Sequence, residues 1–197
     1  MENHRKENNF YVIGLSYKKA DVAIRSKFSL SKENESALLN EARELGMDGV
    51  MVLSTCNRTE IIGFANHPYE LIALLCKYAN GSVDEFANVS FVYKNTEAVE
   101  HFISVATGLD SQILGDYEIV GQLKAAFELA KNANTVNAFI ERLYNTALHA
   151  SKEVKNKTKL SAGTTTVSYA TVQYIKERQE KYPNPKIISQ IIEGMGG

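Results

Sequence analysis

Short apolar runs alternate with helical apolar stripes along the first half of the chain. The run "FYVIGLS" (residues 10–16) is rich in β-branched and aromatic residues and predicts a strand. A helix should follow, with Ser31 as N-cap and Gly46 as stop, because leucine and alanine recur between them at helical spacing. The runs "GVMVLS" and "TEIIGFA" predict two more strands, and the short "TCNR" between them fits a hairpin.

A second helix and a fourth strand complete this pattern. Pro68 is suited to be the first helical residue and Gly81 to end the helix, while "VSFVYK" (residues 89–94) predicts the strand. The order strand, helix, strand, strand, helix, strand is that of the ferredoxin-like split βαβ sheet, with helices on one face. We therefore predict an α+β fold with a sheet core in residues 1–94.

The pattern changes from residue 95 onward to one helix after another. Apolar residues at helical spacing predict three helices, which we interpret as the helical part of the same domain, residues 95–160. A long linker helix is expected over residues 161–182. The stretch "YPNPK" holds two of the three prolines and marks a boundary. Residues 183–197 then begin like a strand, as at the start of a further domain that is cut short.

Composition narrows the class of protein. The chain has 197 residues, 44% hydrophobic and 23% charged, and a formal net charge of −1, so any basic surface must be local. Two cysteines in different contexts cannot form a secreted disulfide framework. No stretch approaches the roughly 18 apolar residues of a membrane span, and the start lacks the apolar region of a signal peptide. We predict a cytoplasmic protein with reduced thiols and no membrane contact.

Cys56 stands in the polar joint between the two hairpin strands rather than in an apolar run. A thiol is already a strong nucleophile, and a nearby cation such as Arg58 raises the fraction present as thiolate. Main-chain N–H groups at such a turn lack ladder partners and could face an oxyanion. The residues alone leave two interpretations open, a nucleophile or a half-buried, inert thiol.

Other polar positions are equally open. His101 borders the apolar stripe of its helix and is either an acid, base or orienting group or an ordinary boundary residue. No histidine or cysteine spacing suggests ligands, so we predict no metal site. Gly121 interrupts a helical pattern at a cost of about 1 kcal/mol, which suggests close approach of another backbone. The lysines of residues 151–159 either end a solvated helix or contact nucleic-acid phosphates.

Three motifs together carry a family resemblance. In order along the chain, "LSTCNRTEI", "GLDSQILGDYEIVGQ" and "SAGTTTVSYATV" resemble the glutamyl-tRNA reductases, and "IGLSYKKADVAIRSKF" resembles their first strand and loop, with Arg25 matching the usual arginine. The resemblance implies that Cys56 attacks the ester of glutamyl-tRNA and holds glutamate as a thioester. It further implies that NADPH reduces this thioester to glutamate-1-semialdehyde, the first step of tetrapyrrole (porphyrin and haem) biosynthesis.

The resemblance also implies roles for further residues. Thr55, Asn57 and Arg58 would contact the substrate beside Cys56, with the Arg58 fork on a glutamyl carboxylate. His101 matches the histidine that the family needs for full activity. The other substrate positions implied by the match are Ser111, Asp116, Tyr117, Glu118 and Gln122. Two departures stand out: "DYE" at 116–118 replaces the usual Glu-Pro-Gln, and Tyr17 replaces a usual histidine.

The family continues into a dinucleotide-binding domain and a helical dimerisation domain. We expect neither in this chain, so it would lack an NADPH site of its own and at most hydrolyse glutamyl-tRNA. The full-length protein is expected to be a homodimer and to contact the next enzyme of the pathway. The alternative is a non-catalytic ferredoxin-like module that binds tRNA or a protein, with strand aromatics such as Phe91 and Tyr93 on its surface and Cys56 incidental.

Overall fold

The computed structural model of the protein describes residues 8–112, 114–115 and 118–157. Its centre is a four-stranded antiparallel sheet in the order β2-β3-β1-β4. The strands are β1 (Asn9–Ser16), β2 (Met51–Ser54), β3 (Arg58–Ala65) and β4 (Phe91–Lys94). This order has the first and third strands in the middle, as in the split βαβ sheet, and confirms the predicted fold class.

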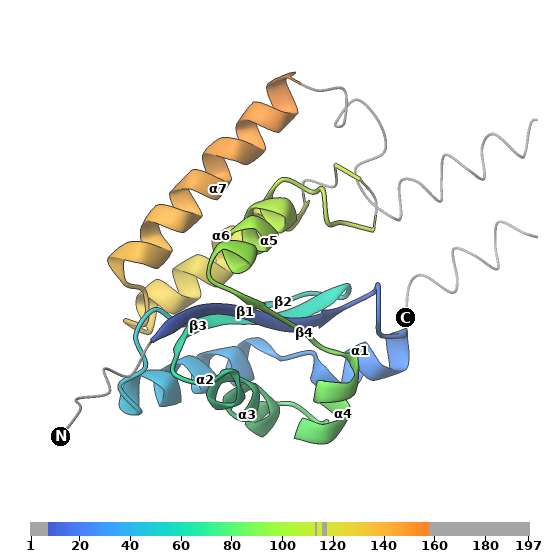
Figure 1. Ribbon diagram of the computed structural model, residues 1–197, viewed down its shortest axis with the longest axis vertical. Coiled ribbons are helices and arrows are strands. Elements are labelled where there is room, and N and C mark those ends of the chain that lie inside the picture. Colours follow the sequence, from blue (N-terminus) through green and yellow to red (C-terminus); the bar gives the residue numbers. More distant parts are fainter. Residues whose placement is uncertain (1–7, 113, 116–117, 158–197) are drawn as a thin grey trace, which may run out of the picture.

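Helices cover both faces of the sheet (Figure 1). Below it in that view lie α1 (Val22–Phe28), α2 (Lys32–Glu44), α3 (Pro68–Tyr78) and α4 (Val83–Val89). Above it lie α5 (Thr96–Ala106), α6 (Glu118–Asn132) and α7 (Ala138–Lys157). The helices within residues 1–94 thus lie on one face of the sheet, as predicted, and the three later helices close the second face and share the buried core with the strands.

Local sequence signals explain most helix ends. The Ser31 hydroxyl caps α2, and Gly46 adopts a φ of +70° just after its end, as predicted. The predicted stop of α3 at Gly81 was wrong, since the helix ends at Tyr78. A Cβ atom at Gly81 would lie 2.2 Å from the ring of Phe28, so this glycine instead makes room for a core aromatic.

The apolar pattern did not predict the two short helices α1 and α4. Both α1 and α4 have seven residues, too few to show an apolar period, but each has a side-chain cap. Asp21 caps α1, and Ser82 with Glu85 forms a capping box at α4. As a result β4 begins at Phe91, two residues later than predicted. The predicted start of α3 at Pro68 is confirmed.

The register of the inner strands decides what lies under α5. Residues directly opposite each other on neighbouring strands share a face. Gly14 of β1 lies opposite Glu60 of β3 on one side and Phe91 of β4 on the other. Phe91 contacts His101 of α5, so this row of the sheet faces the upper helices. Arg58 faces the same side, because it lies two residues before Glu60 on β3.

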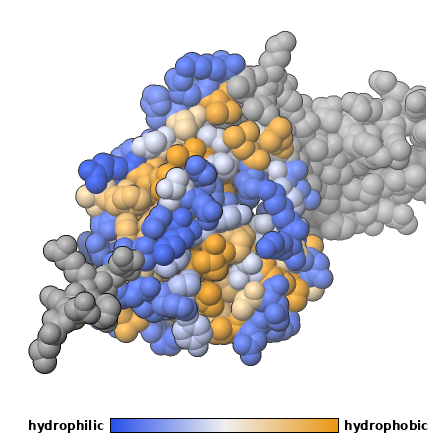
Figure 2. Space-filling model, viewed as in Figure 1, coloured by the Kyte–Doolittle hydropathy of each residue, from blue (hydrophilic) through white to orange (hydrophobic). Residues whose placement is uncertain are grey.

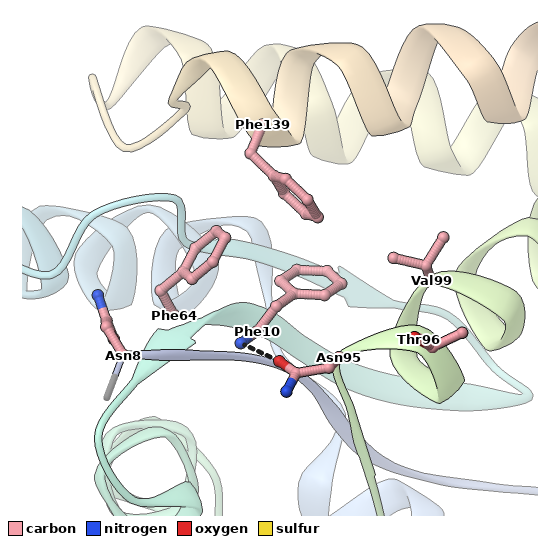
Figure 3. A pocket seen from close by; sticks show the side chains of 7 residues that line it. All are labelled: Asn8, Phe10, Phe64, Asn95, Thr96, Val99 and Phe139. Carbon is pink, nitrogen blue, oxygen red and sulfur yellow. Dashed lines mark hydrogen bonds between the residues drawn. The ribbon is translucent and has the colours of Figure 1, made fainter. Parts of the chain in front are cut away.

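Aromatic packing joins α7 to the far end of the sheet (Figure 3). The rings of Phe10, Phe64 and Phe139 pack with centroids 4.8–5.3 Å apart. A hollow of about 360 Å³ beside them is lined by Asn8, Phe10, Phe64, Asn95, Thr96, Val99 and Phe139. These aromatic side chains pack between sheet and helix, and Phe91 and Tyr93 likewise pack against His101 of α5 rather than forming an open platform for RNA bases, which weighs against the binding-module alternative.

Among the described residues, no helix is long and apolar enough to cross a membrane. Figure 2 shows hydrophilic and apolar residues intermingled on the face viewed in Figure 1, with the apolar ones in separate groups. The linker helix predicted over residues 161–182 and the segment 183–197 lie outside the described residues.

Candidate active site

Cys56 is exposed at the tip of the β2–β3 hairpin, where the sequence placed it. Thr55 closes the turn: its N–H donates to the Arg58 carbonyl oxygen at 2.8 Å, and its hydroxyl accepts from the amides of Asn57 and Arg58, each at 3.2 Å. Two of the amides expected to face an oxyanion are therefore already engaged. No acceptor from the described part of the chain lies on the Cys56 N–H itself, which leaves it able to meet a substrate oxygen.

The loop after β1 and helix α1 brace this turn from the side. The Nε–H of Arg25 donates to the Cys56 carbonyl oxygen at 3.0 Å, and its Nη1 donates to the Ala20 carbonyl at 2.7 Å. The Tyr17 amide donates to the Asn57 carbonyl oxygen at 2.9 Å. These bonds fix the direction of the two peptide groups that follow the thiol.

A buried ion network begins directly behind the turn. Arg58 is 2% exposed, and its Nη1 donates to Glu60 Oε1 at 2.8 Å. Its Nη2 donates to both the carbonyl and the carboxylate of Asp110, the latter at 3.1 Å. Lys18 binds the same Asp110 carboxylate from the surface. The family resemblance assigns the Arg58 guanidinium to a carboxylate of the substrate. In this structure it is instead bound by two of the protein's own carboxylates, those of Glu60 and Asp110.

Opposite charge keeps these groups ionised despite their burial. Burial alone would raise the pKa of Glu60, but Arg58 and the hydrogen bond from His101 outweigh it and hold the pKa below its ordinary value. The same holds for Asp110. Burial alone would raise its pKa, but Lys18 and Arg58 lower it by more, so the pKa lies below its ordinary value. Burial would lower the pKa of Arg58, yet the two carboxylates raise it. The site is therefore a preformed, internally balanced set of charges.

His101 reaches this network from α5. Its Nε2 lies 3.1 Å from Glu60 Oε1, and its side chain is 9% exposed. The ring lies against those of Phe91 and Tyr93, with centroids 4.8 and 4.7 Å away. A depression of about 340 Å³ is lined by Tyr93, Glu97, Glu100, His101, Ser104 and Asp110. The imidazole thus joins a buried carboxylate to a surface opening.

The remaining predicted site residues fall into three groups. Ser111 follows Asp110 in the loop between α5 and α6, so it lies beside the network. Glu118 opens α6, and Gln122 is exposed on the same helix. Asp116 and Tyr117 lie outside the described residues. Gly121 has no neighbouring atom within 4 Å of where a Cβ would stand, so the predicted close approach is not made by the described residues.

Three residues of the network were missed by sequence reasoning. Glu60 is the informative one, since a single acid within the apolar strand "TEIIGFA" indicates a buried, paired carboxylate. Lys18 and Asp110 lie in polar loops and carry no such signal. No group of His, Cys, Asp and Glu side chains within the described residues could hold a metal ion, so no metal is assigned.

Comparison with known proteins decides the family. Residues 13–158 match the model described as "Glutamyl-tRNAGlu reductase, N-terminal domain". The chain belongs to this family. The family match includes Cys56, the ion network and His101, and ends one residue after α7.

Individual glutamyl-tRNA reductases agree with this. The chain is 55% identical over 180 residues to the glutamyl-tRNA reductase of Christiangramia forsetii, covering 91% of this chain and 43% of the relative. It is 56% identical over 177 residues to glutamyl-tRNA reductase 2 of Flavobacterium johnsoniae, covering 89% and 41%. The solved glutamyl-tRNA reductase of Methanopyrus kandleri superposes with a TM-score of 0.67 at 25% identity, covering 85% and 39%. The chain thus spans about two fifths of the length of these relatives.

The described residues do not fit NADPH. The sheet is antiparallel, and none of its described strand-to-helix connections contains a glycine that could bring the backbone close to a pyrophosphate. We therefore assign no chemical step in the described residues to NADPH.

Proposed function

We propose that this chain is the domain of a glutamyl-tRNA reductase that accepts glutamate from glutamyl-tRNA as a thioester on Cys56. The observation that carries the proposal is an exposed thiol on a turn braced by Arg25 and Tyr17, in front of a buried Arg58–Glu60–His101 network. In the proposed step the Cys56 sulfur bonds to the glutamyl carbonyl carbon, the ester bond to the tRNA breaks, and the ribose oxygen leaves with a proton.

The geometry supports a separate role in this step for the Cys56 amide, Arg25 and Arg58. The Cys56 amide is available to stabilise the oxyanion, and Arg25 fixes the carbonyl of the same residue. Arg58 supplies a positive charge behind the turn for the glutamyl carboxylate, for which the substrate would exchange places with Asp110. Reduction to glutamate-1-semialdehyde with NADPH then belongs to the full-length protein.

The direct test is to trap the thioester. Radiolabelled glutamyl-tRNA is mixed with the protein, quenched in acid, and examined for label that stays on the chain and is released by neutral hydroxylamine. We expect label in an amount close to one per chain, because water would attack the thioester only slowly. Binding of the RNA without hydroxylamine-sensitive label would contradict the proposal and favour the binding-module alternative.

The α7 helix is the candidate contact for the tRNA backbone. Its exposed surface carries Arg142, Lys152 and Lys157, with His149 between them, and the acid Glu153 on this side is paired with Lys157. We expect Arg142→Glu with Lys152→Glu to weaken binding of glutamyl-tRNA and to lower the slope of log affinity against log salt by about one for each phosphate that is no longer neutralised.

A matched control separates this effect from general charge. Arg43→Glu reverses an exposed cation on α2, in the helix layer on the other side of the sheet, and should leave the slope unchanged. Equal losses of affinity for both variants would mean that α7 is not a specific RNA surface.

A further inference from the structure

Glu60 is a buried acid at the centre of the site, without an assigned role. It is 1% exposed and lies in the middle of the sheet rather than at the rim of a pocket. One of its oxygens, Oε1, is shared between Arg58 Nη1 at 2.8 Å and His101 Nε2 at 3.1 Å. A single carboxylate atom therefore connects the two side chains that the family resemblance places nearest to the chemistry.

The strand next to it is adapted to this side chain. Gly14 stands directly opposite Glu60, and a Cβ atom there would lie 2.7 Å from Glu60 Cγ and 2.4 Å from the Thr59 carbonyl oxygen. Any other residue at position 14 would force one of them to move. The absence of a side chain at Gly14 thus leaves the space that the Glu60 side chain occupies. This observation on packing does not depend on the ion pairs of Glu60.

The protonation of Glu60 determines which nitrogen of His101 carries a proton. Arg58 and His101 hold the pKa of Glu60 below its ordinary value against the effect of burial, so at neutral pH the carboxylate is ionised and can only accept. The hydrogen bond to His101 then requires a proton on Nε2. In a neutral imidazole this leaves Nδ1 as the nitrogen with a lone pair.

Charged and aromatic groups face the imidazole from several elements. Within the described residues that form the network, Lys18 and Arg58 are balanced by Asp110 and Glu60. Glu97 and Glu100 on α5 line the adjacent depression, and Phe91 and Tyr93 cover the ring from β4. Removal of the Glu60 charge would leave Arg58 with one carboxylate fewer and the imidazole without a fixed orientation.

We propose that Glu60 is a positioning residue that holds Arg58 in place and fixes His101 in the tautomer protonated on Nε2, with Nδ1 ready to accept a proton during thioester formation. This inference rests on the proposed function for its catalytic meaning. The position of the proton can be tested without any substrate.

The test combines Glu60→Gln with ¹⁵N-histidine NMR at neutral pH. A glutamine keeps the size of Glu60 but not its charge, so an amide oxygen at the position shared by Arg58 and His101 accepts more weakly from both, and the Nε2–H tautomer loses part of its preference. The chain has four histidines, and His101→Asn identifies the signals of His101. We expect the Nε2–H tautomer in the unmodified protein and a smaller share of it in the variant, with a fall of roughly 10- to 100-fold in the maximal rate of Cys56 acylation.

The matched control is Glu35→Gln. Glu35 is also 1% exposed and bonded to a lysine, Lys32, but it lies on α2 on the other side of the sheet. This variant should lose some stability and change neither the His101 tautomer nor the acylation rate.

The outcomes distinguish the positioning role of Glu60 from the proposed formation of a thioester on Cys56. A proton on Nδ1 in the unmodified protein, or an unchanged tautomer and rate in Glu60→Gln, would overturn the role of Glu60. A tautomer change in a protein that forms no thioester would keep the positioning role and overturn the proposed function. Gly14→Ala offers a second perturbation that leaves the carboxylate in the chain, and it should shift the same His101 signals.

Discussion

Cys56→Ser is expected to retain no label from glutamyl-tRNA and to release glutamate no faster than the tRNA ester hydrolyses by itself. A serine hydroxyl is a far weaker nucleophile at neutral pH than a thiol with a thiolate fraction. Removal of the attacking atom in covalent enzymes costs roughly 10³-fold or more in rate. The measurement is single-turnover acylation followed by acid quench and scintillation counting.

The second cysteine supplies the control. Cys76 is buried on α3, and burial raises the pKa of its thiol to about 11, so it is an unreactive packing residue. Cys76→Ala should acylate at the unmodified rate. Equal release of glutamate by the Cys56→Ser variant and the unmodified protein would show that the thiol is not the nucleophile.

Arg58→Met should lower the free energy of unfolding by about 3 to 5 kcal/mol, because it leaves Glu60 and part of Asp110 as buried charges without their cation. Methionine keeps much of the length of the arginine, so the loss reports the charge rather than a cavity. Urea denaturation followed by circular dichroism measures it. Acylation of Cys56 should fall in the same variant.

The loss of stability should depend on pH in a defined direction. The pKa values of Glu60 and Asp110 are held below their ordinary values, so their pairing stabilises the fold fully above the pKa of the unfolded carboxyls. This contribution disappears as the pH falls through the lowered values. The difference between Arg58→Met and the unmodified protein should therefore shrink below about pH 4. Arg43→Met, at an exposed site, should stay within about 0.5 kcal/mol at every pH.

The apolar pattern was sufficient for the sheet and the long helices. Strands read from β-branched runs and helices read from leucine spacing appear where expected, because both depend on a face that is buried as a whole. The pattern missed α1 and α4, whose seven residues depend on caps and tertiary packing. It also missed that the later helices cover the sheet, since periodicity shows that a face is buried but not against which partner.

The site was only partly accessible from sequence. The position of Cys56 followed from the hairpin, since the ends of two strands fix their turn. The pairing of Arg58 with Asp110 did not, because Arg58 on β3 and Asp110 in the loop after α5 are separated by 52 residues along the chain. His101 carried no local signal, since its meaning comes from a carboxylate on a strand beneath it.

The Arg25 brace has a consequence for how this domain can be altered. The stretch from Tyr17 to Arg25, which ends in the first turn of α1, is mostly exposed, and such surface stretches ordinarily tolerate inserted residues well. Here one residue of that stretch bonds to the carbonyl groups of both Cys56 and Ala20, so its spacing from β1 sets the nucleophile's position. Even one residue added between Ala20 and Arg25 would act on the reactive turn, and fusion or permutation sites in this protein belong elsewhere.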